Sequence, residues 1–122
     1  MGGESVHALR EFSFDFRSGD YWAIMGTSGS GKSTLLNILG CIDRPTSGSY
    51  KIRDKEVSNL SDGDLSLLRG QELGFIFQSY NLIAQLNVIE NIQLPLIYQE
   101  VSLKEKLPLA IELATLVGLE ER

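Results

Sequence analysis

The feature that most constrains this chain is the run from Gly26 to Ser33, which matches the pattern Gly-x-x-x-x-Gly-Lys-[Ser/Thr]. The run follows a short apolar segment, residues 21–25, which is long enough for a buried strand and too short for a helix. It precedes residues 33–39, whose leucines and isoleucine form an apolar helical face that Gly40 can end. The order strand, glycine-rich loop, helix predicts an α/β fold with a binding site at the loop.

The chemistry of this loop is that of phosphate binding. Its three glycines let the backbone wrap closely around phosphate oxygens, and the helix that follows adds unpaired amides and the positive end of its dipole. We expect Lys32 to place a charge on the β- and γ-phosphates of a nucleotide, Ser33 to hold Mg²⁺, and Thr34 to add hydrogen bonds nearby. The predicted phosphate-binding residues are Gly26, Thr27, Ser28, Gly29, Ser30, Gly31, Lys32, Ser33 and Thr34.

A flexible glycine- and serine-rich loop that precedes a lysine by chance is the alternative interpretation. The placement of a strand before the loop and a helix after it favours the phosphate loop. The loop pattern by itself does not distinguish kinases, GTPases and transport ATPases.

Other strands are predicted by alternation and by short apolar runs. Phe12, Phe14 and Phe16 alternate with polar residues, as in a strand with one buried face. Residues 73–77 form a second short apolar run, and residues 50–52 have the pattern of a short edge strand. These segments predict a parallel core sheet and part of an antiparallel sheet.

A helix is predicted from Ser61, which can cap its first turn, to about Arg69, with Leu65 and Leu68 facing inward. The aspartates Asp62 and Asp64 are candidates for a metal pair. Acidic residues in a first helical turn are ordinary partners of the helix dipole, and we favour that interpretation.

Two further helices are predicted in the last third of the chain. Residues 88–94 have helical spacing, and we expect Pro95 to end that helix. A Ser-x-x-Glu capping pattern at Ser102 opens the next helix, which Gly118 should stop. We expect Pro108 to delay or kink it.

Composition limits the remaining possibilities. A chain of 122 residues with 43% hydrophobic and 22% charged residues has the composition of a globular protein and room for one domain at most. A net charge of −5 makes nucleic acid a poor partner, so any phosphate site must be local. The single cysteine, Cys41, has no second thiol for an intramolecular disulfide and is expected to be a small core residue. No apolar run reaches the length of a membrane span, the first ten residues lack the apolar stretch of a signal peptide, and we expect a soluble chain.

The segment 74–82, followed by 87–92 and 94–96, resembles the Q-loop region of ABC-transporter ATPases. The loop 26–34 and the run Pro-Thr-Ser-Gly at 45–48 resemble the same family at corresponding positions, so the likeness covers nearly the whole chain. Within the family, the lipoprotein-release and macrolide-export type is the most similar.

This resemblance implies a P-loop NTPase (RecA-like) core sheet, part of an antiparallel β-subdomain and the start of a helical subdomain, all truncated. Residues 1–122 would be the N-terminal part of an ATP-binding domain. It implies ATP and Mg²⁺ as cofactors, with Gln78 contacting Mg²⁺ or the attacking water. Without the family pattern, Gln78 at the end of a buried strand would instead be a structural hydrogen-bonding residue.

The resemblance also implies partners and a place in the cell. Two such domains would close head-to-tail over ATP, and hydrolysis would drive a transmembrane permease subunit or domain in export or lipoprotein release. The ATP-binding domain would be cytoplasmic and peripheral on the inner face of the cell membrane.

The chain departs from the family pattern after Arg122, where the Leu-Ser-Gly-Gly-Gln signature would follow. The aspartate-ended Walker B strand, the catalytic glutamate and the switch histidine are also missing, and His7 precedes the loop and does not replace that histidine. We therefore expect a chain that binds ATP and hydrolyses it poorly. The alternatives are a small P-loop kinase, for which we find no acceptor site or lid, and a truncated gene product or regulatory nucleotide binder.

Overall fold

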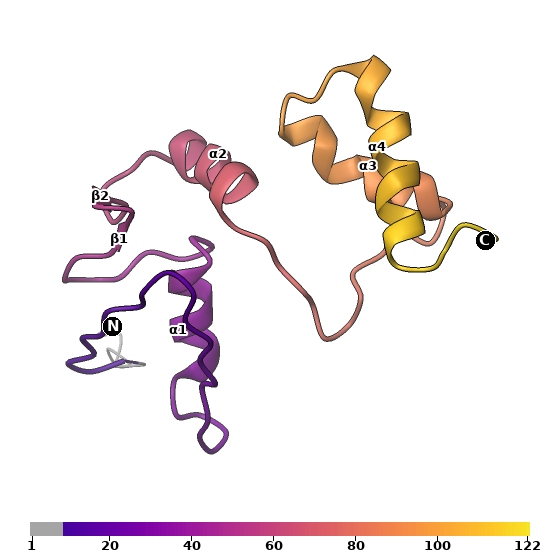
Figure 1. Cartoon of the computed structure of the whole chain (residues 1–122). Helices are drawn as coiled ribbons and strands as arrows, with labels where there is room; N and C mark the ends of the chain where they lie inside the picture. Colours follow the sequence, from indigo (N-terminus) through magenta and orange to yellow (C-terminus); the bar gives the residue numbers. More distant parts are fainter. Residues whose placement is uncertain (1–8) are drawn as a thin grey trace, which may run out of the picture. The chain divides into compact units, whose positions relative to one another are not determined.

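The computed structural model describes residues 9–122, so His7 lies outside the described part of the chain. The chain has two compact units, Met1–Asn59 and Leu60–Arg122. The elements in chain order are α1 (Lys32–Leu39), β1 (Lys51–Ile52), β2 (Lys55–Glu56), α2 (Asp62–Glu72), α3 (Val88–Tyr98) and α4 (Leu103–Leu116) (Figure 1).

The first unit is built around α1 and the β1–β2 hairpin. The hairpin is antiparallel, with Lys51 opposite Glu56 and Ile52 opposite Lys55. Both residues of its two-residue loop, at positions 53 and 54, have positive φ (48° and 63°), as a turn that follows the right-handed twist of the strands requires. The expected strand at 50–52 is confirmed within one residue, and it pairs with the segment that directly follows it.

The carboxylate of Glu56 ties this hairpin together. It accepts hydrogen bonds from the hydroxyl of Ser49 and from the backbone amides of Tyr50 (3.2 Å) and Ser58 (3.1 Å). Hydrogen bonds from the hydroxyls of Ser49 and Ser58, followed by those from the amides, lower the pKa of Glu56 from 4.5 to about 2. The ionised carboxylate therefore stabilises the hairpin.

The second unit contains three helices. Figure 1 shows α3 and α4 side by side, and α2 contacts α3. The side-chain amide of Gln99 donates to the carbonyl of Gly70 (2.9 Å), which ties the end of α3 to α2. Ser61 caps helix α2 as expected, because its Oγ accepts from the Asp64 amide (3.1 Å), and the helix runs three residues beyond the predicted end at Arg69.

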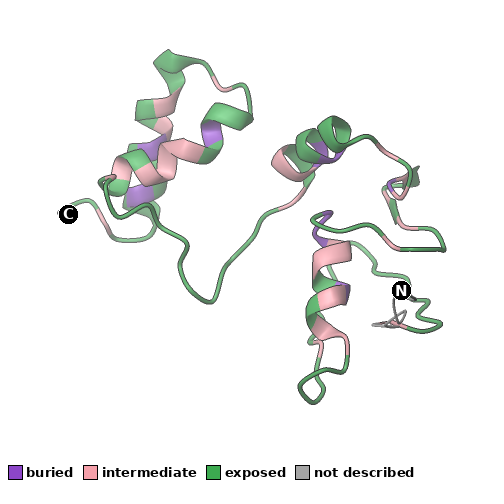
Figure 2. Ribbon diagram, turned by 180° about the vertical axis from the view of Figure 1, so that it is seen from behind, coloured by how far each residue is buried: buried purple, intermediate pink, exposed green. Residues whose placement is uncertain are grey.

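Burial is confined to small clusters in each unit (Figure 2). The buried apolar residues are Leu35, Cys41 and Val57 in the first unit, and Leu65, Leu68, Leu96, Ala110 and Ala114 in the second. Cys41, at 1% exposure, is the small core residue that the sequence predicted. No described helix combines the length and the apolar character needed to cross a membrane.

The strands predicted at 12–16, 21–25 and 73–77 are not formed. Each segment runs as irregular chain, and within residues 9–122 the only strand ladder is β1–β2. A strand needs a hydrogen-bonded neighbour, and strands of a parallel sheet take theirs from distant parts of a sequence. These segments find no such neighbour in the described chain, so the predicted parallel core sheet is absent from it.

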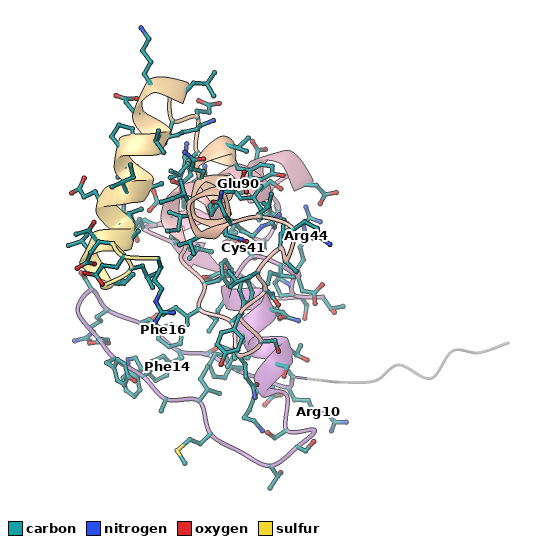
Figure 3. All side chains as sticks on the ribbon, turned by 90° about the vertical axis from the view of Figure 1, so that its right-hand side faces the viewer. Arg10, Phe14, Phe16, Cys41, Arg44 and Glu90 are labelled. Atoms are coloured by element: carbon teal, nitrogen blue, oxygen red, sulfur yellow. The ribbon has the colours of Figure 1, made fainter. Side chains whose placement is uncertain are left out.

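The aromatic side chains of the first segment remain about half exposed, in keeping with the missing sheet. Phe14 packs against Phe16 (ring centroids 4.9 Å apart) and against Trp22 (4.8 Å). Figure 3 labels Phe14 and Phe16, which lie next to each other on this segment. The alternating phenylalanines therefore form an aromatic cluster with Trp22 and no strand.

Pro95 does not end α3, which continues to Tyr98, and this prediction was wrong. Proline has no backbone N–H, so the helix loses one hydrogen bond to the carbonyl four residues earlier. Leu96 directly after it is buried and α3 packs against α4, and this packing offsets one missing bond. The helix starts with a capping box between Asn87 and Glu90 that the sequence analysis missed.

Helix α4 begins at Leu103, so Pro108 does not delay it. Ser102 precedes the helix as expected, but its hydroxyl does not accept from a backbone amide as in a capping box. It donates instead to the carboxylate of Glu105. At the other end Gly118, with φ 73°, carries the predicted stop. The amide of Leu119 donates to Ala114 O (2.9 Å) and that of Gly118 to Thr115 O (3.0 Å), the two bonds of a Schellman motif.

We predict a specific acid dependence for the hairpin from the lowered pKa of Glu56. The stability that the ionised carboxylate contributes is complete above about pH 4.5, the ordinary value. It is lost as pH falls from there through about 2, because the unfolded chain then binds the proton first. Urea midpoints measured from pH 7 down to pH 2 should fall less steeply in this window for Glu56→Gln than for the wild type. Glu112→Gln, which removes an exposed carboxylate from α4, is the control, and equal slopes for both variants would contradict the prediction.

Candidate nucleotide phosphate site

The glycine-rich loop, residues 26–31, precedes α1 directly and lies wholly in the first unit. It turns at Ser28 and Gly29, and the amide of Ser30 donates to Thr27 O (3.2 Å). Gly29 has φ 80°, a conformation that residues with a Cβ rarely adopt. The structure therefore brings the predicted residues Gly26 to Thr34 together in one loop and the first turn of one helix.

Gly31 caps α1 in the left-handed conformation (φ 92°, ψ 6°), and Lys32 after it is right-handed helical. A left-handed residue followed by a right-handed one points successive amides into the same concavity, which is a nest for an anion. The first helical bond runs from the Leu35 amide to Gly31 O (2.9 Å), so the amides of Lys32, Ser33 and Thr34 lie before it at the helix end. No acidic side chain occupies this first turn to compete for these amides.

The ammonium group of Lys32 folds back over the loop. Its Nζ donates to the carbonyl oxygens of Gly26 and Thr27, both at 2.6 Å, and to Ser30 Oγ at 3.4 Å. These charge-assisted bonds hold the loop closed around the lysine and place a positive charge beside the nest. An anion bound there would meet the ammonium group and the helix amides together.

Gly26 lies where the loop closes on itself. A Cβ at this position would come within 2.7 Å of Ser30 Oγ, closer than real Cβ contacts allow, so the Ser30 side chain would have to shift. The loop therefore favours glycine at position 26 because space there is limited by Ser30. It favours glycine at position 31 because the backbone there is left-handed. A close-packed cradle with a lysine above it suits the phosphates of a nucleotide.

Ser33 and Thr34 lie in the first turn of α1, next to the nest, with Ser33 exposed and Thr34 half-buried. The hydroxyl of Ser33 thus reaches the same end of the helix as the loop and is suited to hold a cation that accompanies phosphate. Leu35 on the opposite side of the helix is buried and fixes α1 in its unit.

The opposite end of α1 is held by a residue that the sequence analysis placed only in a strand. The hydroxyl of Tyr50 donates to Leu39 O at 2.8 Å. Burial, and secondarily the nearby Cys41, raise the pKa of Tyr50 from 10.0 to about 12. No local pattern predicts this contact, because it joins residues eleven positions apart through the turn between helix and hairpin.

Gln78 belongs to the second unit, where it follows the irregular segment 73–77 and begins a turn. Its side chain is exposed. The next two loop residues with left-handed backbone are Tyr80 (φ 62°) and Asn81 (φ 53°). Asn91 fixes the chain beyond them: its Oδ1 accepts from the Ile83 amide (2.9 Å) and its Nδ2 donates to the carbonyls of Leu86 and Asn87 (both 3.0 Å).

A glycine-built nest at a helix N-terminus with a lysine above it defines a P-loop nucleotide-binding protein. The class narrows to one family, because the family model described as ABC transporter matches residues 9–122. The chain therefore belongs to the ABC transporter family.

Individual relatives agree with this assignment. An ABC transporter ATP-binding protein of Thermotoga maritima is 51% identical over 122 residues, which are 100% of this chain and 52% of the relative. The macrolide export ATP-binding/permease protein MacB of Mannheimia succiniciproducens is 51% identical over 119 residues, 98% of this chain and 18% of that protein. The chain thus spans about half the length of the first relative.

A solved structure shares the fold. The ATP-binding cassette MJ0796, in a dimeric post-hydrolysis state bound to ADP and Pi, matches with a TM-score of 0.85 and 42% identity, covering 100% of this chain and 54% of that one. The P-loop NTPase fold class, present in part, is therefore confirmed.

We predict that the left-handed cap at Gly31 resists any side chain. Gly31→Ala should lower the free energy of unfolding by ~1–2 kcal/mol, because a Cβ at φ 92° is strained. The matched control is Gly74→Ala, where φ is not positive and a Cβ would meet nothing within 4 Å. Urea denaturation of both variants gives the difference, and equal losses would contradict the conformation assigned to Gly31.

Proposed function

We propose that residues 1–122 form the N-terminal part of an ABC-transporter ATP-binding domain and that this chain binds ATP at the loop Gly26–Thr34. The observation that carries the proposal is the convergence at one helix end of the nest at Gly31 and the ammonium group of Lys32, which lies 2.6 Å from two loop carbonyls. Family membership supports adenine nucleotide as the ligand, and the similar cassette MJ0796 is named as bound to ADP and Pi.

In this proposal the amides of Lys32, Ser33 and Thr34 bind phosphate oxygens, and Lys32 exchanges its carbonyl partners for the β- and γ-phosphates. The exchange replaces bonds to neutral carbonyls by bonds to an anion, which are the stronger kind. Ser33 holds Mg²⁺ through its hydroxyl, and the cation when bound neutralises phosphate charge. Thr34 adds a hydrogen bond to the same group of oxygens.

Gln78 is proposed to contact Mg²⁺ or the attacking water in the assembled site. Its exposed side chain, at the start of a turn, is available to such a ligand, and exposure speaks against the alternative of a structural hydrogen-bonding residue. The neighbouring left-handed residues Tyr80 and Asn81 give the segment a sharply turned backbone.

In the whole protein we propose a head-to-tail pair of ATP-binding domains that drives a transmembrane permease subunit or domain. The dimeric form in which MJ0796 was solved and the combined ATP-binding/permease name of MacB support these partners. The same name supports an export function, of which lipoprotein release is the related form. The domain would then lie on the cytoplasmic side of the membrane as a peripheral component.

We infer that the chain alone binds ATP and hydrolyses it poorly. Phosphoryl transfer needs an oriented nucleophile and charge neutralisation as well as a phosphate cradle. The 122 residues contain the cradle, and they contain no Leu-Ser-Gly-Gly-Gln signature.

The first test of ATP binding is thermal. Ligand at ~100 times its Kd should stabilise the native state by roughly 2.7 kcal/mol, because it binds only the folded chain. Melting of the purified chain with and without Mg-ATP measures this, and an upward shift of Tm is expected. A cooperative melt without a shift would contradict ATP binding by this chain.

The second test removes the lysine. Lys32→Ala should abolish most of the nucleotide affinity, because it deletes the only positive side chain in the loop, while leaving the fold largely intact. Calorimetric titration with Mg-ATP measures the loss, and a far-ultraviolet spectrum checks the fold. Lys104→Ala, an exposed lysine in the first turn of α4, is the matched control. Unchanged affinity in Lys32→Ala would overturn the assignment of the phosphate loop.

A further inference from the structure

Helix α1 is a short element whose two ends have different tasks. It has eight residues, Lys32–Leu39, and isolated helices shorter than about 12–15 residues are marginal in water. Its conformation must therefore be held from outside. Its first turn carries the amides of the phosphate site, so whatever holds the last turn also bears on that site.

Each of the last four carbonyl oxygens of α1 accepts a hydrogen bond from a residue after the helix. Leu36 O, Asn37 O and Ile38 O receive backbone amides, from Gly40 (2.8 Å), Ile42 (2.8 Å) and Cys41 (3.0 Å) respectively. Leu39 O receives the hydroxyl of Tyr50 (2.8 Å). The residues directly after the helix provide the donors for the first three of these carbonyls. Tyr50, next to the hairpin, provides the donor for the fourth with its side chain.

Tyr50 is itself firmly placed. Its amide donates to Ser58 Oγ (2.8 Å) and to the Glu56 carboxylate, and its carbonyl accepts from the Val57 amide (2.8 Å). Val57 is buried and the Tyr50 ring is half-buried. The phenol therefore projects from a fixed strand end onto the helix end and donates its hydrogen to Leu39 O.

We propose that Tyr50 is a positioning residue for the phosphate site, because its hydroxyl fixes the C-terminal end of α1 to the β1–β2 hairpin and so sets the amides of Lys32, Ser33 and Thr34 at the other end. The inference rests on the proposed function of that site. An eight-residue helix is about 12 Å long, so a shift at Leu39 O is transmitted to the nest within two turns.

Tyr50→Phe removes the hydroxyl and keeps the ring. In calorimetric titration with Mg-ATP we expect it to weaken binding about two- to tenfold, the range that the loss of one hydrogen bond produces. The ¹⁵N–¹H resonances of residues 32–34 should shift in Tyr50→Phe without ligand. Tyr21→Phe is the matched control, since the Tyr21 side chain is 97% exposed, and it should change neither.

A second variant separates hydrogen bonding from packing. Fluorotyrosine placed at position 50 makes the phenol a stronger donor of almost unchanged size, and it should retain or tighten the wild-type affinity. Fluorotyrosine and phenylalanine would give equal affinities if the side chain served only to fill space, and that result would overturn the proposal.

The outcomes also separate this inference from the proposed function. If the wild type binds Mg-ATP and Tyr50→Phe binds equally well, the role of Tyr50 is overturned and ATP binding stands. If the folded wild type does not bind Mg-ATP, both are overturned. If binding weakens only in Tyr50→Phe and the resonances of residues 32–34 move with it, both are supported.

Discussion

The first unit depends on the unequal satisfaction of the two ends of α1. A helix leaves amides without partners at its start and carbonyls without partners at its end. In this chain the carbonyl end is satisfied internally, by the turn after Gly40 and by the hydroxyl of Tyr50. The amide end is left to the loop, where Gly31 turns the amides outward. The proposed anion site is thus the end of the helix whose amides have no partner within the helix.

This arrangement explains how an acidic chain can hold a phosphate group. A net charge of −5 repels anions at long range, and the Debye length of about 10 Å at moderate salt screens that field. Within the loop, the ammonium group of Lys32 lies 2.6 Å from two carbonyls, and the helix amides are adjacent. The proposed phosphate site therefore relies on short-range, oriented dipoles and the charge of Lys32, and not on the overall charge of the chain.

The sequence predicted the elements that local chemistry determines. Gly31 and Gly118 need no distant partner to adopt positive φ, and Ser61 caps α2 through an amide three residues away. The glycine-rich loop is of this kind, because its turn and its bonds to Lys32 lie within a few residues of one another. The role of Tyr50 could not, because its partner at Leu39 is set by the path of the chain and not by a motif. Pro95 within α3 shows the converse, since packing of Leu96 outweighs a local rule.

The failure of the strand predictions has a physical cause that bears on function. Alternating Phe12, Phe14 and Phe16 describe a surface that fits a sheet, but a sheet also requires backbone partners, which residues 9–122 do not supply. The phosphate loop does not share this requirement, because its bonds run between Gly26, Thr27, Ser30 and Lys32 within seven residues. The geometry of the loop is therefore encoded locally, whereas the predicted strand that ends at Gln78 needs backbone partners from other parts of a polypeptide.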